Sequence, residues 1–78
     1  MEATKRRILV VGTGSIGERH ARCFLATGRA EIGICESVPE RRDMIAGRYG
    51  IAATFARLDD ALARDWDAVL IATPAQTH

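Results

Sequence analysis

The sequence lacks the features that mark several large classes of protein. None of its apolar runs reaches transmembrane length, and the basic segment Lys5–Arg7 precedes only four apolar residues, too few for a secretory signal. The two cysteines and two histidines show neither metal-ligand nor CxxC spacing, so we expect no metal site. The glycine-rich segment lacks a G-K-[ST] ending, which excludes a phosphate-loop NTPase. We expect a cytoplasmic protein that does not contact a membrane.

Neither sign of charge is in excess. Eleven basic and ten acidic residues give a net charge of +1, and the arginines are scattered along the chain. This balance gives no reason to expect nucleic acid or an anionic membrane as a partner. The 78 residues allow one domain at most, and a chain this short buries only about 60% of its unfolded surface.

The most informative stretch is Ile8–Gly17. Four branched apolar residues, too few for a helix, predict a strand buried on both faces. They lead into a G-x-G-x-x-G pattern, which reads Gly12-Thr13-Gly14-Ser15-Ile16-Gly17. In this pattern the first glycine permits a tight turn, the second lets the backbone approach a pyrophosphate, and the third allows close helix packing. The pattern predicts a dinucleotide site, and the alternative is a glycine-rich turn that binds nothing.

Apolar periodicity and turn residues predict alternating strands and helices. The expected strands are residues 6–12, 31–35, 52–55 and 68–72, and the expected helices are 15–27, 39–49 and 59–64. This alternation predicts an α/β protein, a partial Rossmann fold with a parallel sheet of four strands in the order 3-2-1-4 and flanking helices. A doubly wound domain would continue beyond the fourth strand. We therefore interpret residues 1–78 as the N-terminal part of a longer domain, the alternative being a mini-domain whose edge a partner covers.

Several local patterns give finer expectations. The first helix is expected to turn one face to the sheet, made of Ile16, His20, Ala21 and Phe24. The segment Ser37–Glu40 matches a capping box, S-x-x-E, at the start of the second helix. That helix is expected to pack through Met44, Ile45 and Tyr49 and to stop at Gly50. Both cysteines, Cys23 and Cys35, are expected to be buried as small hydrophobes.

Glu36 is the second most informative residue, because it lies just past the end of the second strand. A carboxylate there accepts hydrogen bonds from the adenosine ribose hydroxyls of NAD and repels the 2′-phosphate of NADP. NAD is therefore the favoured cofactor. NADP stays open, because Ser37 with Arg41 or Arg42 could hold that phosphate.

The last segment follows the fourth strand at its carboxyl end. Open α/β sheets bind ligands in the crevice at this end of the strands, so Thr73 and Pro74 are candidates to border the nicotinamide side of a cofactor. The alternative is an ordinary strand-to-helix turn.

Together these residues resemble the N-terminal domain of the glucose-fructose oxidoreductase / inositol dehydrogenase family (Gfo/Idh/MocA). The resemblance covers essentially the whole chain and rests on four stretches. These are Gly12–Gly17 with Arg19-His20, Glu36 with Pro39-Glu40-Arg41, Tyr49-Gly50-Ile51, and Asp67–Pro74 closing with His78. The last stretch is far more specific than the glycines.

The resemblance implies a two-domain enzyme. A Rossmann domain would bind NAD or NADP, and a C-terminal α/β domain, absent here, would bind a sugar, cyclitol or related polyol that exchanges hydride with nicotinamide. Residues matching Thr73, Pro74 and His78 line the cofactor groove in such relatives. The family's proton-handling lysine in a Glu-Lys-Pro segment is missing from this sequence, so we assign no catalytic residue. A homo-oligomer remains an option.

Other functions are weighed against this one. A non-catalytic module that binds a dinucleotide or a partner through its open edge is the main alternative. A methyltransferase is a further alternative, but its loop usually reads G-x-G-x-G. The two-residue gap before Gly17 and the Thr73-Pro74 ending both argue against a methyltransferase. A flavoprotein is compatible with the glycines and Glu36, but the fourth strand points elsewhere.

Overall fold

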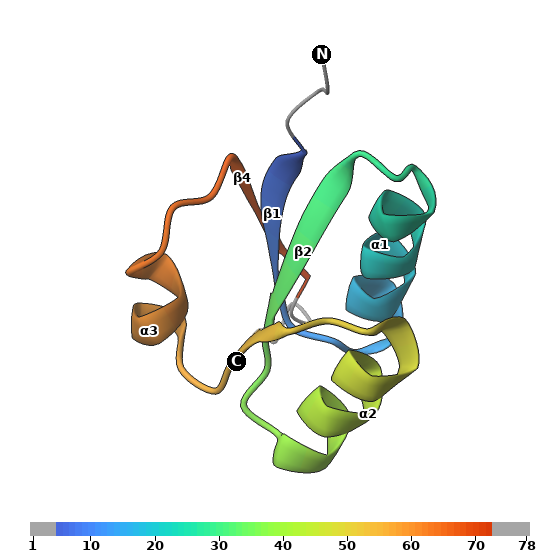
Figure 1. The fold of residues 1–78 in the computed structure, drawn as a ribbon. Helices are drawn as coiled ribbons and strands as arrows, with labels where there is room; N and C mark the ends of the chain where they lie inside the picture. The colour runs from blue at the N-terminus through green and yellow to red at the C-terminus, as the bar shows by residue number, and fades with distance from the viewer. Residues whose placement is uncertain (1–4, 73–78) are drawn as a thin grey trace.

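The computed structural model describes residues 5–72 as alternating strands and helices (Figure 1). The strands are β1 (Arg6–Val11), β2 (Ala30–Cys35), β3 (Ala53–Phe55) and β4 (Ala68–Ile71). The helices are α1 (Ser15–Ala26), α2 (Pro39–Tyr49) and α3 (Leu58–Leu62). Every predicted element is present, and the bounds differ from prediction by about two residues at most.

The four strands form one parallel sheet in the order β3-β2-β1-β4. β1 lies at its centre, with Val10 opposite Ile34 of β2 and Leu70 of β4. The pairing continues past the strand ends, because the N–H of Gly12 donates to the Cys35 carbonyl over 2.8 Å. The predicted α/β class and strand order are confirmed. The turns at the carboxyl ends of β1 and β2 therefore lie side by side.

The sheet has helices on both faces. α1 and α2 cover one face and α3 lies on the other (Figure 1). Alternate residues of β1 divide between two apolar clusters, Ile8 and Val10 on the α1 side and Leu9 and Val11 on the α3 side. Burial on both faces explains the continuous apolar run of this strand.

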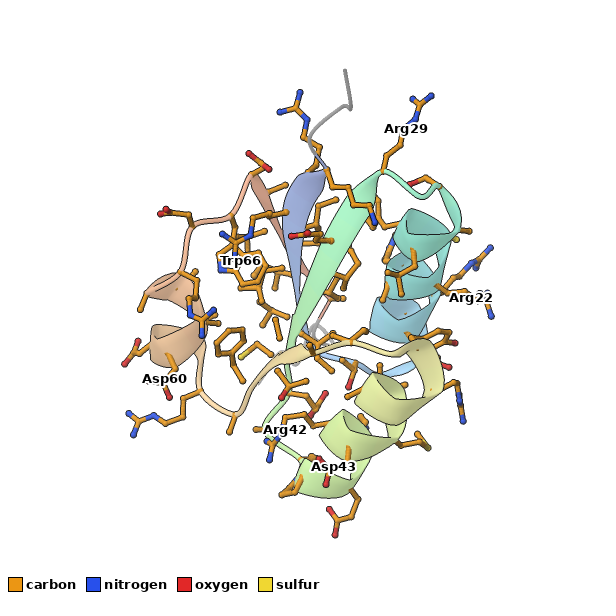
Figure 2. All side chains as sticks on the ribbon, in the orientation of Figure 1. Arg22, Arg29, Arg42, Asp43, Asp60 and Trp66 are labelled. Carbon is orange, nitrogen blue, oxygen red and sulfur yellow. The ribbon has the colours of Figure 1, made fainter. Side chains whose placement is uncertain are left out.

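Trp66 covers much of the face on which α3, a helix of five residues, lies (Figure 2). A Cβ added to Gly33 in β2 would lie 2.3 Å from the Trp66 ring, so glycine there makes room for the indole. The indole N–H donates to the Ala61 carbonyl over 2.7 Å, and the ring meets Phe55 edge-on at 6.2 Å. This tryptophan is a packing residue with its polar atom satisfied.

The face of α1 that meets the sheet differs from the prediction. Ile16 is 61% exposed and His20 is also exposed, whereas Gly17 and Ala21 are buried. As predicted, Ala21 is buried and Phe24 packs half-buried against the core, so only Ile16 and His20 depart from the predicted face. The reason is Gly17, whose missing side chain lets the backbone touch the Gly12 carbonyl and so fixes which side of α1 turns inward. Cys23, on the outer side of α1, is exposed, and only Cys35 is buried as expected.

The capping box predicted before α2 is wrong. The N-cap is Val38, with no side-chain hydrogen bond, and Ser37 lies one residue too early. Pro39 causes this shift, since proline suits the first helical position and holds the preceding residue in an extended conformation. At the other end, α2 stops at Gly50 as predicted, and this glycine adopts a left-handed conformation with φ of 66°.

The apolar stripe predicted for α2 holds only in part. Ile45 is fully buried and Tyr49 is half-buried, but Met44 is 49% exposed. Instead of Met44, the inward face includes half-buried Arg42 and Ala46. Within residues 5–72, the structure has no helix long and apolar enough to cross a membrane.

Candidate functional site

The glycine loop turns sharply from β1 into α1. Gly12 has φ of 92°, a value that side chains rarely allow. Gly14 is the N-cap of α1, and no side chain within the described chain caps that helix. Gly17 is buried, and a Cβ there would lie 1.9 Å from the Gly12 carbonyl oxygen. Gly12 and Gly17 thus have structural reasons to lack a side chain, a left-handed turn at Gly12 and close packing at Gly17.

Gly14 differs from Gly17 in its surroundings. A Cβ added to Gly14 would meet no protein atom within 4 Å. Its φ of −66° is one that any residue adopts. The fold therefore does not require glycine here, although a ligand approaching the backbone closely would.

An open cleft of about 370 Å³ lies at the carboxyl ends of β1, β2 and β3. The turns after these three strands line it. Its residues are Val11, Gly12, Thr13, Gly14, Cys35, Glu36, Ser37, Val38, Arg41, Ala56 and Leu58. The carboxyl end of a parallel sheet is where open α/β folds bind ligands.

Glu36 is the acidic side chain of this cleft and is only 6% exposed. Its Oε1 accepts two hydrogen bonds from Thr13, one from the backbone N–H at 2.7 Å and one from the hydroxyl at 2.8 Å. Its Oε2 accepts the N–H of Val38 at 3.1 Å. The carboxylate is thus held between the glycine loop and the start of α2.

Burial alone would raise the pKa of Glu36, because it disfavours the charged form. The hydrogen bonds from Thr13 and Val38, together with the positive charge of Arg41, outweigh burial and bring the pKa below its ordinary value of 4.5. Glu36 is therefore ionised at neutral pH and presents a fixed negative charge beside the cleft.

This carboxylate makes the stability of the fold depend on pH. Because Glu36 is more acidic in the folded than in the unfolded chain, it stabilises the fold above pH 4.5, and this contribution is lost as the pH falls through the folded pKa. We expect urea denaturation to show a smaller loss of unfolding free energy between pH ~7 and ~3 in Glu36→Gln than in the unchanged chain. Equal losses in both chains would contradict the assigned pKa direction.

Two arginines of α2 lie near Glu36 and play different parts. Arg42 Nη1 donates to the backbone carbonyl of Glu36 over 2.8 Å. Arg41 lines the cleft, half-exposed, with Nη1 3.9 Å from Glu36 Oε1. Ser37 is exposed beside them. Arg42 therefore supports the backbone of the turn, whereas Arg41 and Ser37 are accessible from the cleft.

A second polar contact joins the two helices next to the site. The Tyr49 hydroxyl and Arg48 Nη1, both at the end of α2, donate to Glu18 Oε2 in the first turn of α1 over 2.7 and 2.5 Å. These bonds, from Tyr49 first and then Arg48, lower the pKa of Glu18. The contact ties the end of α2 to the beginning of α1, beside the glycine loop.

The structure brings half of the predicted site residues into the cleft. Those that line it are Gly12, Thr13, Gly14, Glu36, Ser37 and Arg41. Ser15 and Ile16 are exposed on the first turn of α1, and Gly17 is buried under it, so these three lie outside the cleft lining. Thr73, Pro74 and His78 lie outside the described residues.

The sequence analysis did not identify two kinds of residue that contribute to the cleft. Val38 acts through its backbone N–H, which carries no sequence signal. Ala56 and Leu58 line the cleft because they follow β3, a strand adjacent to β2. The predicted strand order was a signal that could have identified these two residues.

The polar groups at this edge suit an organic ligand that carries a phosphate. Between residues 5 and 72, no group of three His, Cys, Asp or Glu side chains could hold a metal. The start of α1 has no side-chain cap, and the open space over Gly14 lets a phosphate reach the N–H groups of the first turn. A nucleotide that carries both phosphate and ribose fits these features together with Glu36.

A family model decides between the families that share such a loop. The model of Gfo/Idh/MocA, an oxidoreductase family with an NAD-binding Rossmann fold, matches residues 6–78. The chain belongs to this family. The resemblance noted from the glycine loop, Glu36 and the fourth strand is confirmed.

Two curated relatives of this chain are named as dehydrogenases. The chain is 36% identical over 74 residues to 4-carboxy-2-hydroxymuconate-6-semialdehyde dehydrogenase of Sphingobium sp. (strain NBRC 103272 / SYK-6), which covers 92% of this chain and 24% of that protein. It is also 36% identical over 75 residues to inositol 2-dehydrogenase of Rhizobium meliloti (strain 1021). That match covers 92% of this chain and 22% of the inositol dehydrogenase. The chain thus spans about a quarter of the length of these curated relatives.

A solved structure shows the same fold. The dehydrogenase WlbA of Bordetella pertussis, crystallised with NADH and UDP-GlcNAcA, superposes with a TM-score of 0.80 at 35% identity. The match covers 91% of this chain and 22% of WlbA. The Gfo/Idh/MocA fold of this chain is therefore the Rossmann fold that the strand order predicts.

Proposed function

We propose that residues 1–78 are the N-terminal part of the cofactor-binding domain of an NAD-dependent oxidoreductase. The intact enzyme would exchange hydride with a sugar, cyclitol or related polyol. Family membership supports the cofactor class. Support for the substrate class comes from one relative named as an inositol dehydrogenase and from another crystallised with a nucleotide sugar.

The observation that carries this proposal is the ionised Glu36 carboxylate at the cleft beside an uncapped helix start. A buried carboxylate is costly unless hydrogen bonds compensate for its lost hydration, and Glu36 accepts such bonds from Thr13 and Val38. At this position it accepts hydrogen bonds from the adenosine ribose hydroxyls and repels a 2′-phosphate. This combination selects NAD over NADP.

The other site residues have distinct proposed roles. Gly12 and Gly17 shape the loop, and Gly14 allows the pyrophosphate to approach the N–H groups of Ser15 and Ile16. Thr13, Ser37 and Arg41 border the adenosine ribose. Thr73, Pro74 and His78 remain proposed contacts toward the nicotinamide.

The nicotinamide ring, when bound, supplies the hydride chemistry. This chain's own residues bind and orient the dinucleotide through the glycine loop and Glu36. The proton of the substrate alcohol requires a base, and we place that group, with the substrate site, in a part of the enzyme outside these 78 residues.

Glu36→Gln tests the proposal because it removes the charge and keeps the shape. We expect the ratio of NAD affinity to NADP affinity, measured by calorimetric titration of the chain, to fall at least about tenfold, since the charge repulsion by Glu36 is lost. Glu36→Asp keeps the charge and serves as the matched control. It should retain a preference for NAD.

An unchanged ratio in Glu36→Gln would contradict this role of the carboxylate. The exposed pair Ser37 and Arg41 would then set the preference. Exchange of Arg41 for Gln in the same titration distinguishes the two explanations, because it removes the cation and leaves Glu36 in place.

A further inference from the structure

Thr13 is an unusual member of the glycine loop because it is almost completely buried, at 2% exposure. Its hydroxyl and its backbone N–H both donate to one oxygen, Oε1 of Glu36, over 2.8 and 2.7 Å. Thr13 therefore provides two of the three hydrogen bonds that the carboxylate accepts from residues 5–72. The hydroxyl is engaged by the protein itself.

The remaining contacts hold Glu36 from other directions. The N–H of Val38 reaches Oε2, and Arg42 binds the backbone carbonyl. A free glutamate side chain rotates about three bonds, and each rotation away from the cleft would break the Thr13 contacts. Among the described residues 5–72, Thr13 is the one residue whose side chain donates a hydrogen bond to this carboxylate.

We propose that Thr13 is a positioning residue that sets the preference for NAD over NADP by holding Glu36 in place. This inference rests on the proposed function, because it assigns the source of selectivity within the same site. Repulsion of a 2′-phosphate requires that the negative charge cannot swing aside. A freed carboxylate would also release Arg41, 3.9 Å away, to pair with that phosphate.

The charge state of Glu36 supports the same role. Burial raises the pKa of Glu36, and the two Thr13 hydrogen bonds are among the contacts that more than offset it. Loss of the hydroxyl should therefore raise this pKa as well as loosen the side chain.

Thr13→Val and Thr13→Ser form a complementary pair, because valine replaces the threonine hydroxyl with a methyl group, whereas serine keeps the hydroxyl and loses the methyl group. We expect calorimetric titration of the chain to show an affinity ratio of NAD to NADP about tenfold lower in Thr13→Val, because a hydrogen bond to a charged group contributes about that factor. NADP should gain more affinity than NAD loses. Thr13→Ser should keep the original ratio.

A second readout requires no cofactor. ¹³C NMR titration of the Glu36 carboxyl group should give a higher pKa in Thr13→Val than in the unchanged chain, and no such rise in Thr13→Ser. If Thr13→Val does not fold by circular dichroism, Thr13→Ala supplies the same comparison with a smaller side chain.

The outcomes separate the two proposals. An unchanged ratio of NAD to NADP affinity in Thr13→Val, including equal weakening of both dinucleotides, would overturn the positioning role while the proposed function stands. Failure of the unchanged chain to bind either dinucleotide would overturn the proposed function, and the selectivity assigned to Thr13 with it.

Discussion

Gly17→Ala is expected to lower the free energy of unfolding by about 3 kcal/mol or more, as measured by urea denaturation. The added methyl carbon would lie 1.9 Å from the Gly12 carbonyl oxygen and 2.9 Å from its carbon, which are backbone atoms that cannot rotate away. Relief requires α1 to move off the sheet, and that movement would expose Ala21 and its neighbours. For a 78-residue chain this is a large share of the total stability.

Helix propensity acts in the opposite direction at this site. Alanine is better than glycine inside a helix by about 1 kcal/mol, so a purely local account predicts stabilisation. The matched control is Gly47→Ala in α2, where a Cβ meets nothing within 4 Å. We expect that variant to gain roughly 0.5–1 kcal/mol. If Gly17→Ala behaves like Gly47→Ala, the close packing of α1 on the turn after β1 is wrong.

Gly14→Val is expected to abolish detectable NAD binding while leaving the circular dichroism spectrum unchanged. The site tolerates a side chain, because φ is negative and the space around a Cβ is empty of protein atoms. Gly14 also lines the cleft, so valine would occupy the space through which a pyrophosphate reaches the start of α1. The cost to the fold should stay below about 1 kcal/mol, the difference between glycine and valine as an N-cap.

The size of the side chain provides a graded control for this prediction. Gly14→Ala should weaken NAD binding less than Gly14→Val, and both should unfold at similar urea concentrations. Retained binding in Gly14→Val would contradict the placement of the pyrophosphate over the loop. Comparison of the two Gly14 variants with Gly17→Ala shows whether each glycine is needed for ligand binding or for the stability of the fold.

The sequence was sufficient to predict the architecture for physical reasons. The apolar run in β1 is continuous because its residues alternate between two covered faces. Gly28 and Gly50 end the first two helices in the left-handed conformation that glycine adopts without strain. The apolar residues of β2 were predicted to end at residue 35, and this prediction placed Glu36 directly after the carboxyl end of the strand.

The finer geometry depends on contacts that a linear pattern does not contain. Ile16 and His20 were wrongly assigned to the inner face of α1 because the Gly17–Gly12 contact, rather than hydrophobicity, decides the rotation of the helix. The start of α2 was predicted correctly, but its cap was not, because Pro39 at the first helical position makes Val38 rather than Ser37 the N-cap. The bond between Thr13 and Glu36 joins residues 23 positions apart, so it could be found only once β1 and β2 were paired.

The most direct test of the account is a calorimetric titration of the unchanged 78-residue chain with NAD and, separately, with NADP. The account predicts saturable one-to-one binding of NAD and weaker binding of NADP, because the glycine loop receives the pyrophosphate and Glu36 meets the ribose. Absence of saturation with NAD, or tighter binding of NADP, would contradict it.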